Sequence, residues 1–270
     1  MGSERVAIVP RLRARGRTFL DRLDSDAAEP LPASHVSPRV RVAIVLAVAA
    51  LSLIAMRYAI LPGQAQDGMV RAVRPLLGLD DTEFKRHAEL LRAVAWSLGA
   101  VVFYLAIPLL VVRFAFGHRA SHYGFTLRGF RRHLALYLGL LAPVVVIVIV
   151  AAGSSDFQAK YPLYRHPIGA PDLIAWELCY GLQFVALEFF FRGFLIHGVR
   201  DRLGTASVFT MVVPYVMIHF EKPLYETLGA LVAGTVLGFL SLRTRSIAGG
   251  VLIHFAVALT MDLAALARQS

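Results

Sequence analysis

Long uncharged stretches recur along this chain and constrain its fold more than any other feature. Residues 93–112 and 134–153 carry no charge, and residues 42–61 carry only Arg57, close to one end. About 20 apolar residues in a helix cross the roughly 30 Å hydrocarbon core of a bilayer. These stretches therefore predict an all-α, polytopic bundle of transmembrane helices.

Four further stretches are apolar enough to lie in the membrane, although two of the seven are short. They are residues 173–191, 206–218, 227–242 and 246–267. Only 17% of the residues are charged, against about 25% in an ordinary soluble domain, which argues against a soluble enzyme. We expect one membrane-embedded domain over residues 39–270, after a flexible, basic, cytoplasmic tail over residues 1–38.

The distribution of Lys and Arg predicts the orientation of the chain. The formal net charge is +10, which we attribute to contact with an anionic bilayer surface rather than with nucleic acid. With the N-terminus inside, the inner segments carry 8, 5, 3 and 2 basic residues and the outer loops carry 5, 2, 1 and 1. Because cytoplasmic loops are enriched in Lys and Arg, we expect the N-terminus in the cytoplasm.

Ionisable residues inside the predicted spans point to a functional site, since such groups are costly in a bilayer. Glu188 and Arg192 are four residues apart and share a helix face, as do His254 and Asp262, eight apart. At 1.5 Å per residue, Glu188 and His219 each lie roughly 23 Å from the turn at residue 204. We therefore expect these side chains to meet in one intramembrane cavity.

Two interpretations of this cluster remain open from the residues alone. A buried carboxylate beside two imidazoles can activate water, and Glu188, His219 and His254 also match a common zinc ligand set. Alternatively, buried charges neutralise one another and fix the helix register. For Glu177, on the same helix face as Glu188, we favour a hydrogen-bonded structural acid.

Three motifs in this region resemble those of the CPBP family of intramembrane proteases, which includes CAAX prenyl protease 2 and bacterial bacteriocin-processing and immunity proteins. Residues 187–195, LEFFFRGFL, resemble a motif of two Glu, three residues and Arg. Residues 215–219, YVMIH, resemble Phe-x-x-x-His. His254, followed four residues later by Ala258, resembles a His–Asn motif. The similar core covers roughly residues 172–267.

The resemblance implies a bundle of seven to eight helices in a bacterial inner membrane that cleaves a membrane-associated peptide or protein. Family members place a Glu and the second-motif His on the attacking water, which correspond to Glu188 and His219. The third-motif His, here His254, faces the oxyanion, and Arg192 holds the acid. The cofactor is then none or a divalent metal such as zinc on Glu188, His219 and His254.

Two positions depart from the family pattern. Leu187 stands where the family has its first Glu, and Ala258 stands where it has Asn. Asp262, one turn beyond Ala258, is a candidate to replace the missing polar group. A catalytically inactive relative that binds or protects membrane partners is therefore an alternative, and a small proton-coupled carrier is a third.

Overall fold

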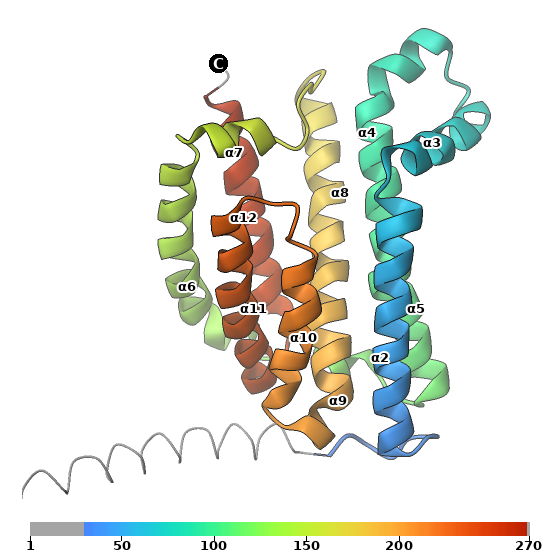
Figure 1. Ribbon diagram of the computed structural model, residues 1–270, viewed down its shortest axis with the longest axis vertical. Coiled ribbons are helices and arrows are strands. Elements are labelled where there is room, and N and C mark those ends of the chain that lie inside the picture. The colour runs from blue at the N-terminus through green and yellow to red at the C-terminus, as the bar shows by residue number, and fades with distance from the viewer. Residues whose placement is uncertain (1–29, 269–270) are drawn as a thin grey trace, which may run out of the picture.

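A computed structural model describes residues 30–268 of the protein, and every regular element in that part of the chain is helical (Figure 1). The helices are α2 (Pro38–Ala55), η1 (Met56–Ile60), α3 (Gly63–Leu77), α4 (Asp81–Ala100), η2 (Val101–Ala106), α5 (Ile107–Leu110), η3 (Val111–Ala115), η4 (Ala120–Tyr123), α6 (Phe130–Ala151), α7 (Ser155–Lys160), α8 (Ala170–Glu188), η5 (Phe189–Leu195), α9 (Ile196–Leu203), α10 (Ala206–Met217), α11 (Leu224–Thr244) and α12 (Ala248–Leu266).

Six continuous helical segments are long and apolar enough to cross a membrane. They are Pro38–Ile60, Asp81–Ala115, Phe130–Ala151, Ala170–Leu203, Leu224–Thr244 and Ala248–Leu266. Helix α10 is apolar but shorter. The predicted all-α, polytopic bundle is confirmed, with one helix at each of the seven predicted positions. The expected count of seven to eight membrane-crossing helices stays a prediction.

Local sequence signals explain where several helices begin and end. The carboxylate of Asp80 accepts hydrogen bonds from the backbone N–H groups of Thr82 and Glu83 at 2.7 and 2.8 Å, which caps the start of α4. Helix α3 ends at Gly78, whose φ of 65° suits a residue without a Cβ. These two signals end α3 and begin α4, so the chain changes direction between them.

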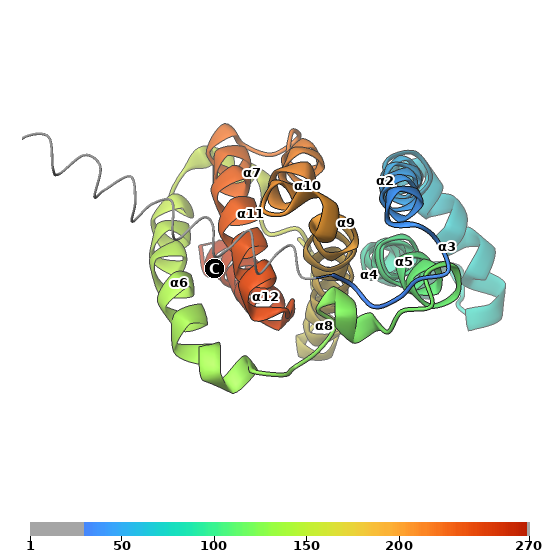
Figure 2. The same ribbon diagram turned by 90° about the horizontal axis from the view of Figure 1, so that it is seen from below.

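The rod formed by α8, η5 and α9 joins the two halves of the bundle. Figures 1 and 2 show it between α2, α4 and α5 on one side and α6, α10, α11 and α12 on the other. On the first side, Ser97 of α4 donates a 2.7 Å hydrogen bond to the carbonyl of Cys179. Near its centre the rod buries Phe189, Phe190 and Phe191 completely. The central rod therefore holds its polar residues in place from both sides.

Helix α10 ends well before the helices around it. Its 12 residues span roughly 18 Å at 1.5 Å per residue, against a hydrocarbon core of about 30 Å. The chain then turns at residues 218–223 and enters α11, and this turn lies below the tops of α8 and α12 in Figure 1. The short helix leaves room above its end for a cavity within the bundle.

The segment before α2 packs against the loop before η4. Residues 1–29 of the predicted flexible tail lie outside the described residues. Further along, Leu31 is buried, and the Nε2 of His118 donates a 3.0 Å hydrogen bond to the carbonyl of Pro32. Arg41, in the first turn of α2, forms a buried ion pair with Asp201 at the end of α9. The start of the membrane domain is thus tied to the central rod.

Candidate active site

A fully buried carboxylate lies at the centre of the site, at the last residue of α8. Glu188 is 0% exposed, and its Oε1 lies 3.1 Å from a guanidinium nitrogen of Arg192. The same oxygen lies 3.0 Å from Nδ1 of His254 on α12. The structure therefore brings together three of the predicted site residues, from two different helices.

Arg192 lies within the π-helix η5, one turn after Glu188, and is also fully buried. Its guanidinium carbon lies 3.9 Å from the centre of the Tyr215 ring, on α10. An aromatic face attracts a cation through its quadrupole. The guanidinium is thus neutralised by Glu188 on one side and stabilised by the Tyr215 ring on another.

A glycine that the sequence motifs did not single out makes room for the acid. Gly250 lies on α12, one turn before His254, and a Cβ placed on it would come 3.0 Å from Cδ of Glu188 and closer to Oε2. Oε2 has no hydrogen-bond partner among the described residues. Gly250 is therefore required for the close approach of α12 to the carboxylate.

Two histidines of the site engage the same ring nitrogen, Nδ1, within the protein. His219, in the turn after α10, donates from Nδ1 to the carbonyl of Tyr215 at 2.8 Å, and His254 directs its Nδ1 to Glu188. These contacts leave the Nε2 lone pair of each neutral imidazole free for another partner. Burial lowers the pKa of His219 to about 4, so this ring is neutral near pH 7.

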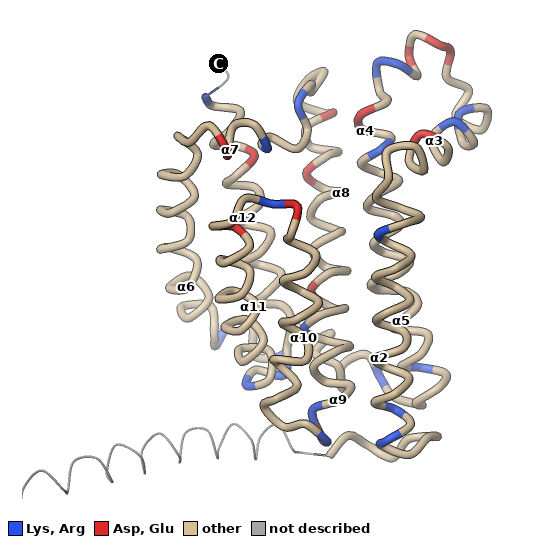
Figure 3. The backbone as a smooth tube through the Cα atoms, viewed as in Figure 1, with Lys and Arg blue, Asp and Glu red and all other residues tan. Residues whose placement is uncertain are grey.

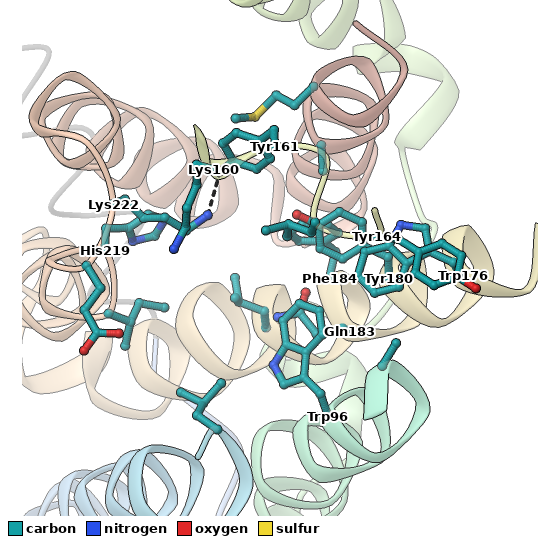
Figure 4. A pocket seen from close by; sticks show the side chains of 18 of the residues that line it. Trp96, Lys160, Tyr161, Tyr164, Trp176, Tyr180, Gln183, Phe184, His219 and Lys222 are labelled. Atoms are coloured by element: carbon teal, nitrogen blue, oxygen red, sulfur yellow. Dashed lines mark hydrogen bonds between the residues drawn. The ribbon is translucent and has the colours of Figure 1, made fainter. Parts of the chain in front are cut away.

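The two histidines line one cavity of about 510 Å³, which lies above the end of α10. Figure 4 shows His219 and Lys222 on one side of it and a group of aromatic rings on the other. Leu187, Gln183 and Ala258 also line the cavity, whereas Glu188 does not. Glu188 therefore reaches this space only through His254, which is 17% exposed.

The aromatic side of the cavity is a continuous series of ring contacts. Ring centres are 5.0 Å apart for Trp176 and Tyr180, 4.6 Å for Tyr180 and Phe184, and 4.4 Å for Phe184 and His254. Trp96 of α4 stacks on Trp176 at 6.3 Å. This aromatic wall is apolar and rigid, and it leads directly to the imidazole of His254.

Asp262 is not brought to Glu188. Its carboxylate accepts a 3.0 Å hydrogen bond from the indole N–H of Trp176 and a 3.2 Å bond from the backbone N–H of Leu163, and it is 1% exposed. These contacts fix the aromatic wall and the loop before α8. A catalytic role for Asp262 stays a prediction, and its contacts favour a positioning role.

Glu177 differs from its prediction. Neither carboxylate oxygen of Glu177 has a hydrogen-bond partner among the described residues, although both are buried. The prediction of a hydrogen-bonded acid was wrong for the described residues, among which no side chain or backbone group donates to Glu177.

The described residues do not gather three metal ligands. Among residues 30–268, no group of three His, Cys, Asp or Glu side chains is arranged to hold a metal ion. His219 and His254 offer two Nε2 lone pairs, but the third predicted ligand, Glu188, is turned toward Arg192 and toward Nδ1 of His254. The arrangement does not fit a three-ligand zinc site, and we derive no step through a metal.

Comparison with known families now adds to this geometry. Residues 171–260 match the family described as type II CAAX prenyl endopeptidase Rce1-like. This match supports membership of the CPBP family. The matched region contains α8 except for its first residue, all of η5, α9, α10 and α11, and the part of α12 that carries Gly250 and His254. Searches among curated proteins and among solved structures found no match.

Within the matched region, the two departures from the family pattern both face the cavity. Leu187 and Ala258 contribute apolar surface to its wall, at positions where the family has a carboxylate and an amide. Gln183, one turn before Leu187 on α8, also lines the cavity, and its Oε1 has no partner among the described residues. Next to Leu187 and Ala258, the polar groups of the cavity are therefore the amide of Gln183 and the imidazole of His254.

Proposed function

We propose that the protein is an intramembrane endopeptidase that hydrolyses a peptide bond in a membrane-associated protein or peptide. The match to a protease family supports the class of reaction. The observation that carries the proposal is the 3.0 Å contact between Glu188 and His254 at the cavity wall. A carboxylate on one imidazole nitrogen increases the basicity of the other, as in hydrolases that use a histidine base.

In the proposed mechanism, His254 takes the proton and Glu188 positions it. A water in the cavity gives a proton to Nε2 of His254 while its oxygen bonds to the carbonyl carbon of the substrate. Glu188 stabilises the resulting imidazolium through Nδ1. The proton then passes to the leaving amine as the C–N bond breaks, and the acid and the amine are released.

The cavity also offers groups for the charge that develops on the carbonyl oxygen. The side-chain amide of Gln183 lines the same space as His254, and amide N–H groups stabilise such an oxyanion when they are fixed in advance. His219 presents an Nε2 acceptor, which orients the attacking water. We assign Gln183 and His219 these two roles in the proposed reaction.

The direct test is cleavage by the purified protein in lipid, with a library of fluorogenic membrane-proximal peptides. We expect turnover that is lost in His254→Ala and kept in the matched control His166→Ala, since the His166 side chain is 84% exposed. Equal activity in wild type and His254→Ala, with both proteins folded, would rule out His254 as the proton acceptor.

A catalytically inactive relative that binds membrane partners is the second candidate, and one observation favours it. Leu187 lines the cavity where the family has a glutamate. If the protein is inactive for this reason, Leu187→Glu should gain turnover on the same library. If His254 is the proton acceptor, the wild type already shows turnover, and Leu187→Glu does not create activity in a protein that lacked it.

We further propose that the protein lies in a bacterial inner membrane with its N-terminus in the cytoplasm. Its six long apolar helices make it an integral membrane protein. The partners are then the lipid bilayer and a membrane-associated peptide, with no role for nucleic acid.

A further inference from the structure

We propose that the catalytic cavity opens on the extracytoplasmic side of the membrane. The substrate is then a peptide segment presented at the extracytoplasmic surface of that same membrane. The inference deepens the proposed function and rests on it. It is argued from the position of the cavity mouth, from the charges at the two ends of the bundle and from helix α3.

The cavity mouth lies at one end of the bundle. Besides His219 and His254, the cavity is lined by Gln66 of α3, Lys160 at the end of α7 and Glu221 in the turn after α10. In Figure 1, α3, α7 and the start of α4 all lie at the end opposite α9. Since α10 stops at Met217, the turn that follows it, with Ile218, His219 and Glu221, forms one wall of the cavity at this end.

The opposite end of the bundle is strongly basic. Its connections are residues 30–41, 113–133, 200–206 and 243–248, in which Asp201 is the one acid and is paired with Arg41. Figure 3 shows acidic residues together with basic ones at the end that carries α3 and α7. There, residues 61–92, 152–169 and 218–223 carry eight Lys and Arg, against eleven in the connections of the basic end. The exposed arginines of the basic end are Arg39, Arg113, Arg119, Arg128, Arg131, Arg132, Arg202 and Arg243.

Lys and Arg next to membrane helices are retained on the cytoplasmic side, whereas Asp and Glu contribute little to orientation. The basic end, which also receives the N-terminal segment, is therefore cytoplasmic. The cavity mouth opens at the other end and is extracytoplasmic. A substrate then reaches the apolar residues of the cavity from the extracytoplasmic side.

Helix α3 indicates how the substrate arrives. It runs across the direction of the spanning helices beside the cavity mouth (Figure 1), and it exposes Leu76 and Val73 together with Arg71. Apolar and basic faces on one helix favour a position in the plane of the headgroups. The mouth thus lies at the membrane surface, within reach of a peptide that is anchored in the same leaflet.

The aromatic wall restricts the residue next to the cleaved bond. Trp96, Trp176 and Tyr180 form an apolar surface that leads to His254, and an apolar side chain is stabilised by leaving water for such a surface. The inferred substrate is an exported or membrane-anchored peptide with an apolar side chain beside the scissile bond.

Cysteine labelling tests the orientation without requiring activity. The full-length chain has one native cysteine, Cys179, and Cys179→Ser gives a background for Lys160→Cys at the mouth and Arg131→Cys at the basic end. A membrane-impermeant maleimide is applied to spheroplasts and to inside-out vesicles. We expect Lys160→Cys to react in spheroplasts and Arg131→Cys to react only in inside-out vesicles.

The reverse pattern would overturn the inference, as would reaction of both cysteines from the same side or no reaction of Lys160→Cys in either preparation. The peptide assay keeps this failure separate from that of the proposed function. Correct labelling together with turnover that is unaffected by His254→Ala refutes the mechanism alone. Turnover that depends on His254, together with reversed labelling, refutes the orientation alone.

Discussion

Replacing Glu188 by glutamine tests whether the buried ion pair is as closely coupled as the geometry indicates. Glutamine keeps the shape of the side chain but leaves Arg192 charged, 0% exposed and without its counter-ion. Removing one partner of a buried pair costs about 3–5 kcal/mol, because the other charge remains buried. The Tyr215 ring contacts Arg192 in the wild type as well, so its cation–π contact, about 0.5–2 kcal/mol, is kept in Glu188→Gln and lost only when Arg192 is replaced.

A double-mutant cycle measures the coupling. Glu188→Gln and Arg192→Gln should each lower the free energy of unfolding by about 3–5 kcal/mol, and Arg192→Gln also loses the contact with the Tyr215 ring. The double variant buries no net charge and should be at least about 2 kcal/mol more stable than the sum of the single losses predicts. Equilibrium unfolding in mixed micelles of detergent and SDS gives the free energy of unfolding of the wild type, the two single variants and the double variant.

The exposed ion pair between Arg57 and Glu221 is the matched control. Its atoms are 2.6 Å apart, but its side chains are 57% and 71% exposed, and such surface pairs contribute about 0–1 kcal/mol. Additive losses at Glu188 and Arg192, or a loss for Glu188→Gln as small as that of the control, would refute the reasoning. Turnover should be absent in both Glu188→Gln and the double variant, which separates catalysis from stability.

Four further predictions follow from the site. Gly250→Ala should abolish turnover by displacing the carboxylate of Glu188, whereas Gly229→Ala, which has open space around its Cα, should leave turnover unchanged. Because the pKa of His219 falls from 6.5 to about 4 on folding, the unfolded chain binds more protons between these values and stability rises with pH there; unfolding of His219→Gln should lack this slope. Asp262→Asn should lower stability by about 1–3 kcal/mol through its lost hydrogen bonds while kcat changes less than in Glu188→Gln; an equal fall in kcat would restore Asp262 as a catalytic acid. Turnover should persist in a chelator, and full recovery by added zinc after a complete loss would contradict a reaction without metal.

The fold was predictable because an apolar stretch of about 20 residues is long enough to cross a bilayer as a helix. Residues 134–153 were expected as a span, and α6 covers Phe130–Ala151. The ends were less accurate, since α4 begins at Asp81, among charged residues that extend beyond the apolar stretch. Helical spacing also placed Glu188 beside Arg192, although the segment after Glu188 is a π-helix rather than an α-helix.

The site was predictable only as far as sequence spacing reports on depth and helix face. Spacing on α12 grouped His254 with Asp262, but in the structure these two side chains have different partners. His254 contacts Glu188, whereas Asp262 accepts a hydrogen bond from the indole of Trp176. The need for Gly250 depends on how closely two helices approach, which no pattern within one helix records. The glycine pair at residues 249–250 was the signal available in the sequence.

The stacked indoles of the aromatic wall give the protein an intrinsic optical reporter. The chain contains two tryptophans, and both line the cavity, with ring centres 6.3 Å apart. A molecule that enters the cavity therefore changes the polarity around every indole in the chain. The emission of the unlabelled protein therefore reports occupancy of the cavity, and peptides that bind without being cleaved can be found by the same titration as those that are.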